Sequence, residues 1–213
     1  HYVSRETMVI IASLEKLLPI MNQVYDITWR KELKEETVPN EEKIFSIYEQ
    51  HTDIIVKGSR EVVFGHKINL VTGKSNLVLH CDVLRGNPSD GSLYPSTLDN
   101  VIDTYGRVPR DSAKDGSFAN SYNLRHARNR GVVNVVFNKI TSSLKNQLSS
   151  KNLETRLKKW RSGIEANISN IKRGFELQRC IWNGWAHFQA KVLWSIIAYN
   201  IRVMTRLMVA RLL

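Results

Sequence analysis

The stretch VVFGHKINLVTGKSNLVLHCDV, residues 62–83, indicates the fold of this chain most directly. Its two halves, Val62–Leu70 and Leu77–Val83, are rich in β-branched and apolar residues, and Gly73 stands between them. Runs of this kind, joined by a short loop that contains glycine, predict a pair of antiparallel strands.

The sequence before this hairpin predicts strands, a short linker and a helical segment. The runs Ile44–Tyr48 and Asp53–Val56 predict two more strands of an antiparallel meander. Residues 7–37 are instead expected to be helical, with a break near Pro19, because proline has no N–H and clashes with the preceding turn. Val38–Asn40 is expected to be a short linker.

Downstream of the hairpin, helices and strands are expected to alternate. A short strand should precede Asp115, and Thr141–Lys151 should be an exposed connection. The other expected elements are helices at Leu93–Tyr105 and Asn123–Asn129, a buried strand at Val132–Phe137, a helix near residues 161–175 and a last helix at Arg179–Leu212. This order predicts an α/β fold, a mixed sheet flanked by helices, and an RNase H-like core has the same alternation.

The expected domain organisation follows from these elements. Residues 1–37 form a helical segment, the tail of an upstream or inserted helical region, and residues 38–213 form the core. The chain starts without methionine, in a segment that is already helical, so we expect an incomplete domain with sequence missing upstream.

The net charge of +11 is unevenly distributed. Residues 1–106 carry 11 basic and 15 acidic side chains, residues 107–150 carry 8 and 2, and residues 151–213 carry 12 and 3. A basic second half predicts a polyanionic partner, usually nucleic acid, and the alternative is a solvated basic surface.

The cysteines and the apolar C-terminal segment bear on compartment and membrane contact. Cys81 and Cys180 have no CxxC spacing, so we expect reduced thiols in a cytoplasmic protein. Charged residues interrupt the apolar C-terminal helix, which therefore predicts a buried or docking helix and no membrane span.

Three polar residues of the C-terminal part, Arg161, Glu165 and Lys172, follow the pattern R-x3-E-x6-K. At 100° per residue they fall within about 40° of one another on a single expected helix. A carboxylate between two cations suits a site where a divalent metal and DNA phosphates meet.

Asp115 is the first candidate for a second metal-binding carboxylate. It follows an expected strand, and Gly116 beside it allows a sharp turn close to a ligand. The alternative is that Asp-Gly is only a turn.

The runs Lys114–Asn120 and Phe64–Lys67, with Gly86–Asp90 and the helix over residues 161–172, together resemble the later part of a bacterial insertion-sequence DDE transposase. The resemblance extends from about Pro39 to Asn200. It implies an RNase H-like domain that gathers Asp, Asp and Glu around Mg²⁺ or Mn²⁺.

The resemblance also implies roles for individual residues. Asp115 would be the second acid and Glu165 the third, both catalytic and both metal ligands, while Arg161 and Lys172 would meet DNA. The family's first acid lies on an early strand that has no counterpart here, and Lys158 replaces an aromatic residue of the family's motif.

Further basic residues are assigned to DNA. Lys114 stands next to Asp115, and Arg125 and Arg128 belong to a basic cluster expected to follow the DNA backbone. A solvated helix face is the alternative for that cluster.

The function implied is metal-dependent DNA cleavage and strand transfer in transposition, by a fragment that is inactive alone because the first acid is missing. Partners would be transposon ends and target DNA near the bacterial nucleoid, and a homodimer is left open. The alternatives are a non-catalytic DNA-binding remnant and another RNase H-like nuclease.

Overall fold

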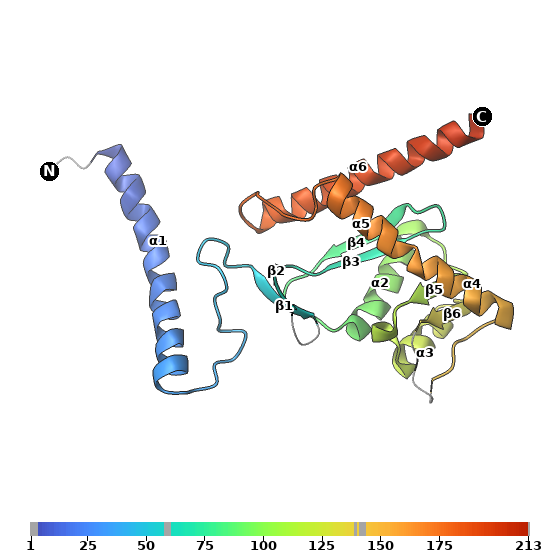
Figure 1. The fold of residues 1–213 in the computed structure, drawn as a ribbon, viewed down its shortest axis with the longest axis horizontal. Helices are drawn as coiled ribbons and strands as arrows, with labels where there is room; N and C mark the ends of the chain where they lie inside the picture. Colours follow the sequence, from blue (N-terminus) through green and yellow to red (C-terminus); the bar gives the residue numbers. More distant parts are fainter. Residues whose placement is uncertain (1–3, 58–60, 139, 141–143, 213) are drawn as a thin grey trace. The chain divides into compact units, whose positions relative to one another are not determined.

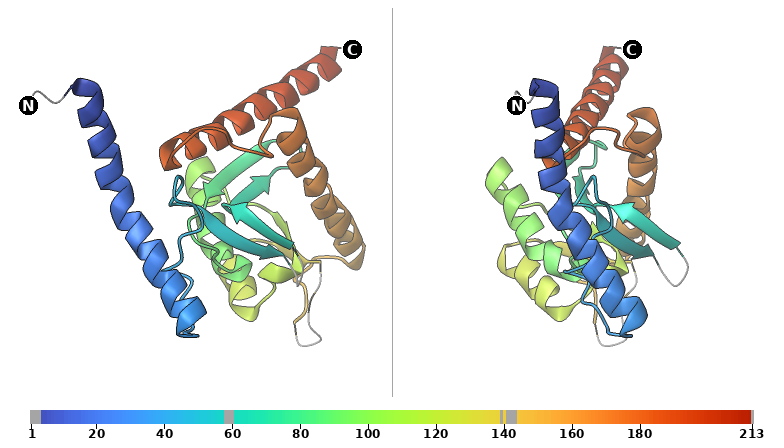
Figure 2. Two further views of the ribbon diagram at one scale, coloured as in Figure 1. Left: turned by 60° about the vertical axis from the view of Figure 1, so that its left-hand side comes forward. Right: turned by 90° about the vertical axis from the view of Figure 1, so that its left-hand side faces the viewer.

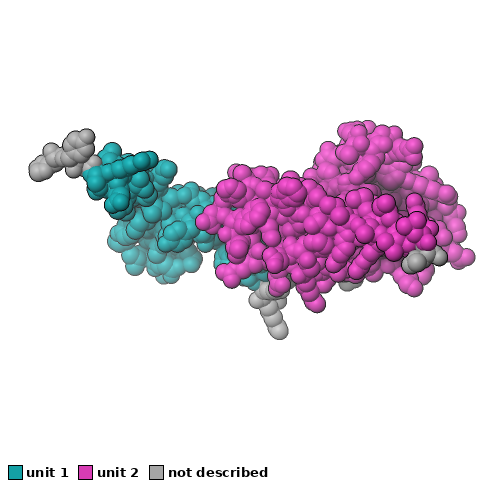
Figure 3. Space-filling view, turned by 90° about the horizontal axis from the view of Figure 1, so that it is seen from above, with its two compact units in different colours: residues 1–65 teal, residues 66–213 magenta. Residues whose placement is uncertain are grey.

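The computed structural model describes residues 4–57, 61–138, 140 and 144–212. The chain divides into two compact units, residues 1–65 and 66–213, which Figure 3 colours separately. Helices and small sheets are mixed along the chain (Figure 1), which is compatible with the predicted α/β class.

The first unit begins with a long helix, α1 (Arg5–Thr28), which continues as a π-helical turn, η1 (Trp29–Leu33). The hydroxyl of Ser4 caps it by accepting a hydrogen bond from the backbone N–H of Thr7 at 3.2 Å. The predicted break near Pro19 was wrong, because the helix runs through this residue. Proline removes a single backbone donor, and the intact hydrogen bonds on both sides hold the helix together.

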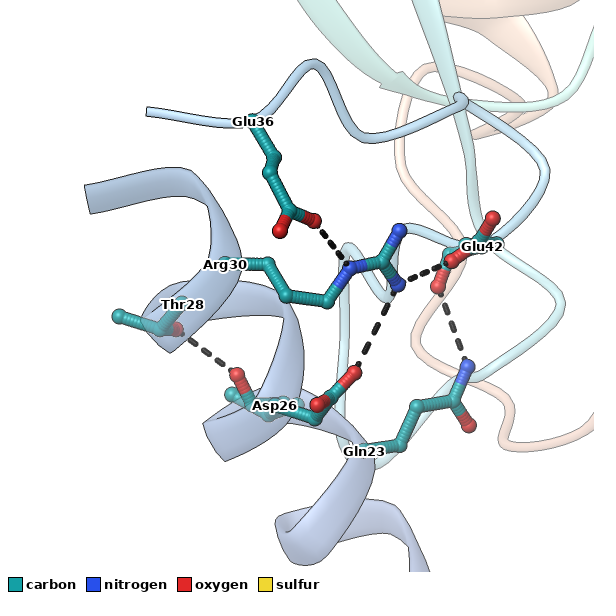
Figure 4. A network of polar contacts seen from close by, with 7 residues as sticks. Gln23, Asp26, Thr28, Arg30, Glu36 and Glu42 are labelled. Atoms are coloured by element: carbon teal, nitrogen blue, oxygen red, sulfur yellow. Dashed lines mark hydrogen bonds and ion pairs between the residues drawn. The ribbon is translucent and has the colours of Figure 1, made fainter. Parts of the chain in front are cut away.

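A network of polar contacts fixes the end of this helix (Figure 4). Arg30 contacts Glu42 at 2.7 Å and Glu36 at 3.0 Å, and its guanidinium lies 3.6 Å from Asp26. The Gln23 amide donates to the backbone carbonyl of Glu42 at 3.1 Å. These contacts hold the chain that follows the helix against its last turns.

The first unit ends in an antiparallel hairpin of β1 (Asp53–Lys57) and β2 (Glu61–Gly65), in which Ile55 lies opposite Val63. The strand predicted at Ile44–Tyr48 is absent from this described part of the chain. The side chain of Tyr48 is 89% exposed. A β-branched run forms a strand only where a neighbouring strand pairs with it.

The second unit opens with another antiparallel hairpin, β3 (Ile68–Thr72) with β4 (Val78–Val83). The run Val62–Leu70, predicted as one strand, is therefore two strands, separated after Gly65. Gly65 has φ +149°, a conformation that side chains disfavour. The predicted turn at Gly73 is confirmed by its N–H, which donates to the carbonyl of Leu77 at 2.9 Å.

A parallel pair, β5 (Asp111–Lys114) and β6 (Asn134–Phe137), lies at the centre of the main core. The helices α2 (Asp90–Tyr105) and α3 (Ser121–Asn129) pack on it, and the short 3₁₀ turn η2 (Gly116–Phe118) follows β5. The buried side chains of this core are Tyr94, Leu98, Ala127, Val132, Val135 and Phe137. The described strands form three separate two-stranded sheets, where the sequence predicted one mixed sheet.

Two helices stand where one was predicted around the R-x3-E-x6-K pattern. They are α4 (Lys151–Ser162) and α5 (Ile164–Gly174), and Gly163 lies between them. The prediction of a single helix carrying all three polar residues was therefore wrong. Glycine weakens a helix interior, because it loses more backbone freedom on folding than other residues do.

The connection into α4 lies closer to the core than expected. Residues 141–143 of the predicted exposed connection are outside the described residues. Farther along, Gln147 forms an antiparallel bridge with Val135, which is fully buried. Gln147 thus attaches this connection to β6, and Asn146–Leu148 are half-buried, whereas Ser149–Lys151 are exposed as predicted.

The last helix, α6 (Trp185–Leu212), begins six residues later than the predicted Arg179. Its first half packs on the β3–β4 hairpin, beside which the left view of Figure 2 draws it, and buries Val192, Ile196 and Tyr199. By length and composition alone this helix could cross a membrane, and most of it is exposed. A docked core helix passes the same test, so the absence of a membrane partner stays a prediction.

Candidate functional site

A cavity of about 270 Å³ lies in the second unit between β3, β5 and the junction of α4 with α5. Its charged lining residues are Lys67, Asp90, Lys114, Asp115 and Arg161. The apolar part of the wall includes Trp160, Ile164 and Ile168. The cavity therefore combines acids and bases at the end of β5.

The free edges of two strands also border this cavity. Its lining includes consecutive residues of both, 67–72 around β3 and 112–115 around β5. Side chains alternate between the two faces of a strand, so a lining of consecutive residues indicates an edge. Within the described residues β3 pairs with β4 and β5 with β6, which leaves the two facing edges unpaired.

Asp115 is fixed by the turn that follows β5. Its Oδ1 accepts a hydrogen bond from the N–H of Gly116 at 2.8 Å, which caps η2. Its Oδ2 lies 3.4 Å from a terminal nitrogen of Arg161. The carboxylate of Asp115 therefore caps a turn, as the alternative of a simple Asp-Gly turn requires. It also lines the cavity.

Arg161 joins the two predicted metal ligands. Its second terminal nitrogen donates to Oε1 of Glu165 at 3.1 Å, one helical turn away. Because a guanidinium is compact and planar, the bonded oxygens of Asp115 and Glu165 lie within roughly 9 Å of each other. The structure therefore brings Asp115 and Glu165, 50 residues apart in sequence, to one guanidinium.

A second acid of the cavity, Asp90, was not among the predicted site residues. Lys67 lies 2.7 Å from its carboxylate. Burial raises the pKa of Asp90, but hydrogen bonds from Lys67 and Ser117 and the charges of Lys67 and Lys114 outweigh burial, so this pKa lies below its ordinary range. Asp90 stands in the run Gly86–Asp90 that carries the family resemblance, which was the available signal.

Lys114 is half-buried and lines the cavity, with its ammonium group over the rings of Phe118 and Tyr94. Burial and, to a lesser extent, the charge of Arg161 lower the pKa of Lys114 to about 8, although the charges of Asp82 and Asp90 oppose this shift. An ammonium group that is this enclosed can reach a ligand only within the cavity.

The remaining predicted DNA contacts lie elsewhere. Lys172 is exposed in the last turn of α5, about 10 Å along the helix axis from Glu165, and does not line the cavity. Arg125 and Arg128 are exposed on α3, and Arg128 donates to the side chain of Gln147 at 2.9 Å. Of the predicted site residues, Asp115, Lys114 and Arg161 thus line the cavity, and Glu165 lies beside it. Lys172, Arg125 and Arg128 lie outside it.

The carboxylates of the site suit Mg²⁺ or Mn²⁺ in kind, since both ions prefer oxygen ligands. They fall short in number: the described residues contain no cluster of three acidic, histidine or cysteine side chains that could hold a metal. Arg161 also lies between the two predicted ligands and would have to turn aside. The residues present therefore fit part of a metal site.

The comparisons with known proteins give one match. Residues 118–205 match the family model described as "Transposase DDE domain". A search of curated proteins and a search of solved structures found no match. The matched stretch is less than half of the chain and contains Arg161, Glu165 and Lys172, whereas Asp115 precedes it by three residues. The predicted resemblance to a DDE transposase is therefore confirmed over residues 118–205.

Proposed function

We propose that this chain is the later part of the RNase H-like catalytic domain of an insertion-sequence DDE transposase, which cuts and transfers DNA strands in transposition. The observation that carries the proposal is Arg161, which contacts both Asp115 and Glu165 at the cavity. Two carboxylates held this way, in or beside a stretch that matches a transposase domain, are suited to phosphoryl transfer.

The two facing strand edges support the RNase H-like assignment. An unpaired edge exposes backbone donors and acceptors and is usually covered or paired. A strand of four to six residues between β3 and β5 would pair with both edges and join two of the small sheets into one mixed sheet. We infer that such a strand supplies the first acid, because its side chains would enter the cavity beside Asp115.

The site residues would share the chemistry as follows. Bound Mg²⁺ or Mn²⁺ would activate the attacking oxygen and stabilise the leaving one. Asp115 and Glu165 would supply ligand oxygens, and Arg161 would exchange its contact with them for a DNA phosphate. Lys114 would add positive charge beneath the phosphate, in a position that burial shields from bulk water.

A non-catalytic DNA-binding remnant is the second candidate. Its support is that the described residues lack a three-ligand cluster while the second half of the chain is strongly basic. Both candidates share DNA as the partner. A homodimer and a location at the nucleoid in the bacterial cytoplasm remain part of the proposal.

Mg²⁺-dependent nicking of a supercoiled plasmid tests the proposal. The 213 residues alone should nick little, and a protein that also carries the upstream strand should nick well. Asp115→Asn or Glu165→Gln should abolish nicking in the longer protein, whereas Asp103→Asn, an exposed acid on α2, should not. Robust cleavage by these 213 residues that survives Asp115→Asn would contradict the assignment.

A further inference from the structure

A second cavity, of about 220 Å³, lies in the second unit between the turn of the β3–β4 hairpin, α5 and the middle of α6. Figure 1 shows these three elements meeting. Its polar wall is built from Ser75, Asn76, Asn167, Asn170, Tyr199, Arg202 and Arg206. None of the described residues that line it is acidic. The cavity therefore presents two guanidinium groups without a carboxylate to neutralise them.

Arg202 holds its charge in a confined position. Its guanidinium lies 4.7 Å from the centre of the Phe175 ring, and its Nη1 is 3.5 Å from the place where a side chain on Gly174 would start. Its Nε is buried and has no hydrogen-bond partner among the described residues. A cation–π contact offsets only part of the cost of a half-buried guanidinium whose Nε is unpaired, so this charge favours an anionic ligand.

Hydrogen bonds within the wall occupy both acceptors of Asn76. Asn76 adopts a left-handed backbone with φ +65°. Its carbonyl accepts from the Tyr199 hydroxyl at 3.0 Å, and its side-chain oxygen accepts from the Asn167 amide at 3.4 Å. The groups that remain for a ligand include the donor nitrogens of the two arginines, the side chain of Asn170 and the hydroxyl of Ser75.

The charges of Arg202 and Arg206 both influence the hydroxyl of Tyr199. Burial raises the pKa of Tyr199, while the positive charges of Arg202 and Arg206 oppose that rise. Their influence on one hydroxyl agrees with their shared position in the cavity lining. Arg206 and Asn170 are exposed, so the mouth of the cavity is open to a large ligand.

We propose that this cavity binds a phosphate group of a polynucleotide backbone. Charge favours a polymer over a free ion, because residues 151–213 carry 12 basic and 3 acidic side chains. The cavity is separate from the metal site: at 100° per residue, Asn167 and Asn170 lie roughly 140–200° around α5 from Glu165. It would engage the backbone at a second point, whether or not the chain cleaves DNA.

Binding of a labelled 20-base-pair duplex, followed by fluorescence anisotropy at several salt concentrations, tests this proposal. Arg206→Gln should weaken binding about fivefold or more and reduce the slope of log affinity against log salt by about 1. The control is Arg211→Gln, which removes the same charge from an exposed position on α6 outside the cavity. Arg206→Lys should recover part of the affinity.

Arg202 needs a conservative pair of variants, because its stacking on Phe175 could also serve folding. Arg202→Gln should weaken duplex binding at least as much as Arg206→Gln, and Arg202→Lys should weaken it less. Circular dichroism would show whether each variant keeps its fold. A folded Arg202→Gln variant with unchanged affinity and salt slope would overturn the proposal.

Three other results would also overturn it. Equal effects of Arg206→Gln and Arg211→Gln would indicate a general basic surface. Inorganic phosphate is a second probe: if phosphate perturbs the amide resonances of Asn76 and Asn170 and the duplex does not, the site is one for small anions. If Arg202→Gln and Arg206→Gln weaken binding of the protein to phosphatidylglycerol vesicles but not to the duplex, the cavity is a site for lipid headgroups.

A variant that loses nicking but binds the duplex normally would affect only the catalytic proposal.

Discussion

Arg161 on α4 contacts Asp115 at the end of β5, with 3.4 Å between a guanidinium nitrogen and the carboxylate. The same guanidinium contacts Glu165, in the first turn of α5, at 3.1 Å. The side chain of Arg161 is 19% exposed, against 47% for Asp115 and 63% for Glu165. Arg161 is thus part of the wall of the cavity, and Asp115 and Glu165 contact it from the solvent side.

Replacing Arg161 should reveal how strongly this contact stabilises the fold. We expect Arg161→Gln to lower the free energy of unfolding by about 1 kcal/mol, because ion pairs with exposed carboxylates are weak and two acids are left facing each other. Urea denaturation measures this change. Arg156→Gln, exposed on the same helix, is the control and should change stability by less than about 0.5 kcal/mol. Equal losses in both variants would show that the contact adds nothing.

Asn123 should be essential for the turn that carries Asp115. Its buried amide donates to the carbonyls of Gly91 and Phe118 at 2.8 and 2.9 Å. Asn123→Ala leaves both carbonyls unpaired and should cost about 2 kcal/mol, measured by thermal unfolding. Asn129→Ala, exposed at the end of α3, is the control. A loss no larger than that of the control would mean that water replaces the amide.

Cys81 should make stability depend on pH in the alkaline range. Burial and the nearby charge of Asp82 raise its pKa from 9.0 to about 12. The folded state keeps a thiol proton that the unfolded chain releases between these values, so stability is full below pH 9 and falls as pH rises toward 12. The fall attributable to this thiol is at most about 4 kcal/mol.

The comparison of wild type with Cys81→Ala isolates that contribution. Urea denaturation below pH 9 and again between pH 9 and 12 should show a smaller fall for the variant. Cys180→Ala serves as the control for loss of a thiol outside β4. If wild type and Cys81→Ala lose stability in parallel, the thiol of Cys81 ionises as freely in the folded protein as in the unfolded chain.

The sequence predicts those elements whose local pattern and burial agree. Val132–Phe137 is apolar except for Asn134 and contains the fully buried strand β6, and Asn123–Asn129 is helical as expected. Ile44–Tyr48 is also rich in β-branched and aromatic residues, but no described strand pairs with it. Local propensity identifies a segment that can form a strand, and pairing decides whether it does.

The candidate site shows a similar division. The approach of Asp115 to Glu165 follows from the requirement that ligands of one metal converge. The pairing of Asp90 with Lys67 depends on the register that α2 adopts against β3, and no local pattern encodes that register. The distance of Lys172 from the cavity follows instead from its place about two turns beyond Glu165 on α5. Their assigned roles in metal and DNA binding stay predictions.

Mn²⁺ binding to the 213-residue chain, measured by electron paramagnetic resonance, tests the central claim that Asp115 and Glu165 share a metal. Asp115→Asn and Glu165→Gln should each weaken binding by about tenfold or more, and the double variant should be little worse than either, because both changes remove the same site. Asp103→Asn should bind as wild type does. Losses that multiply in the double variant, or single variants that bind like the Asp103 control, would contradict a shared metal.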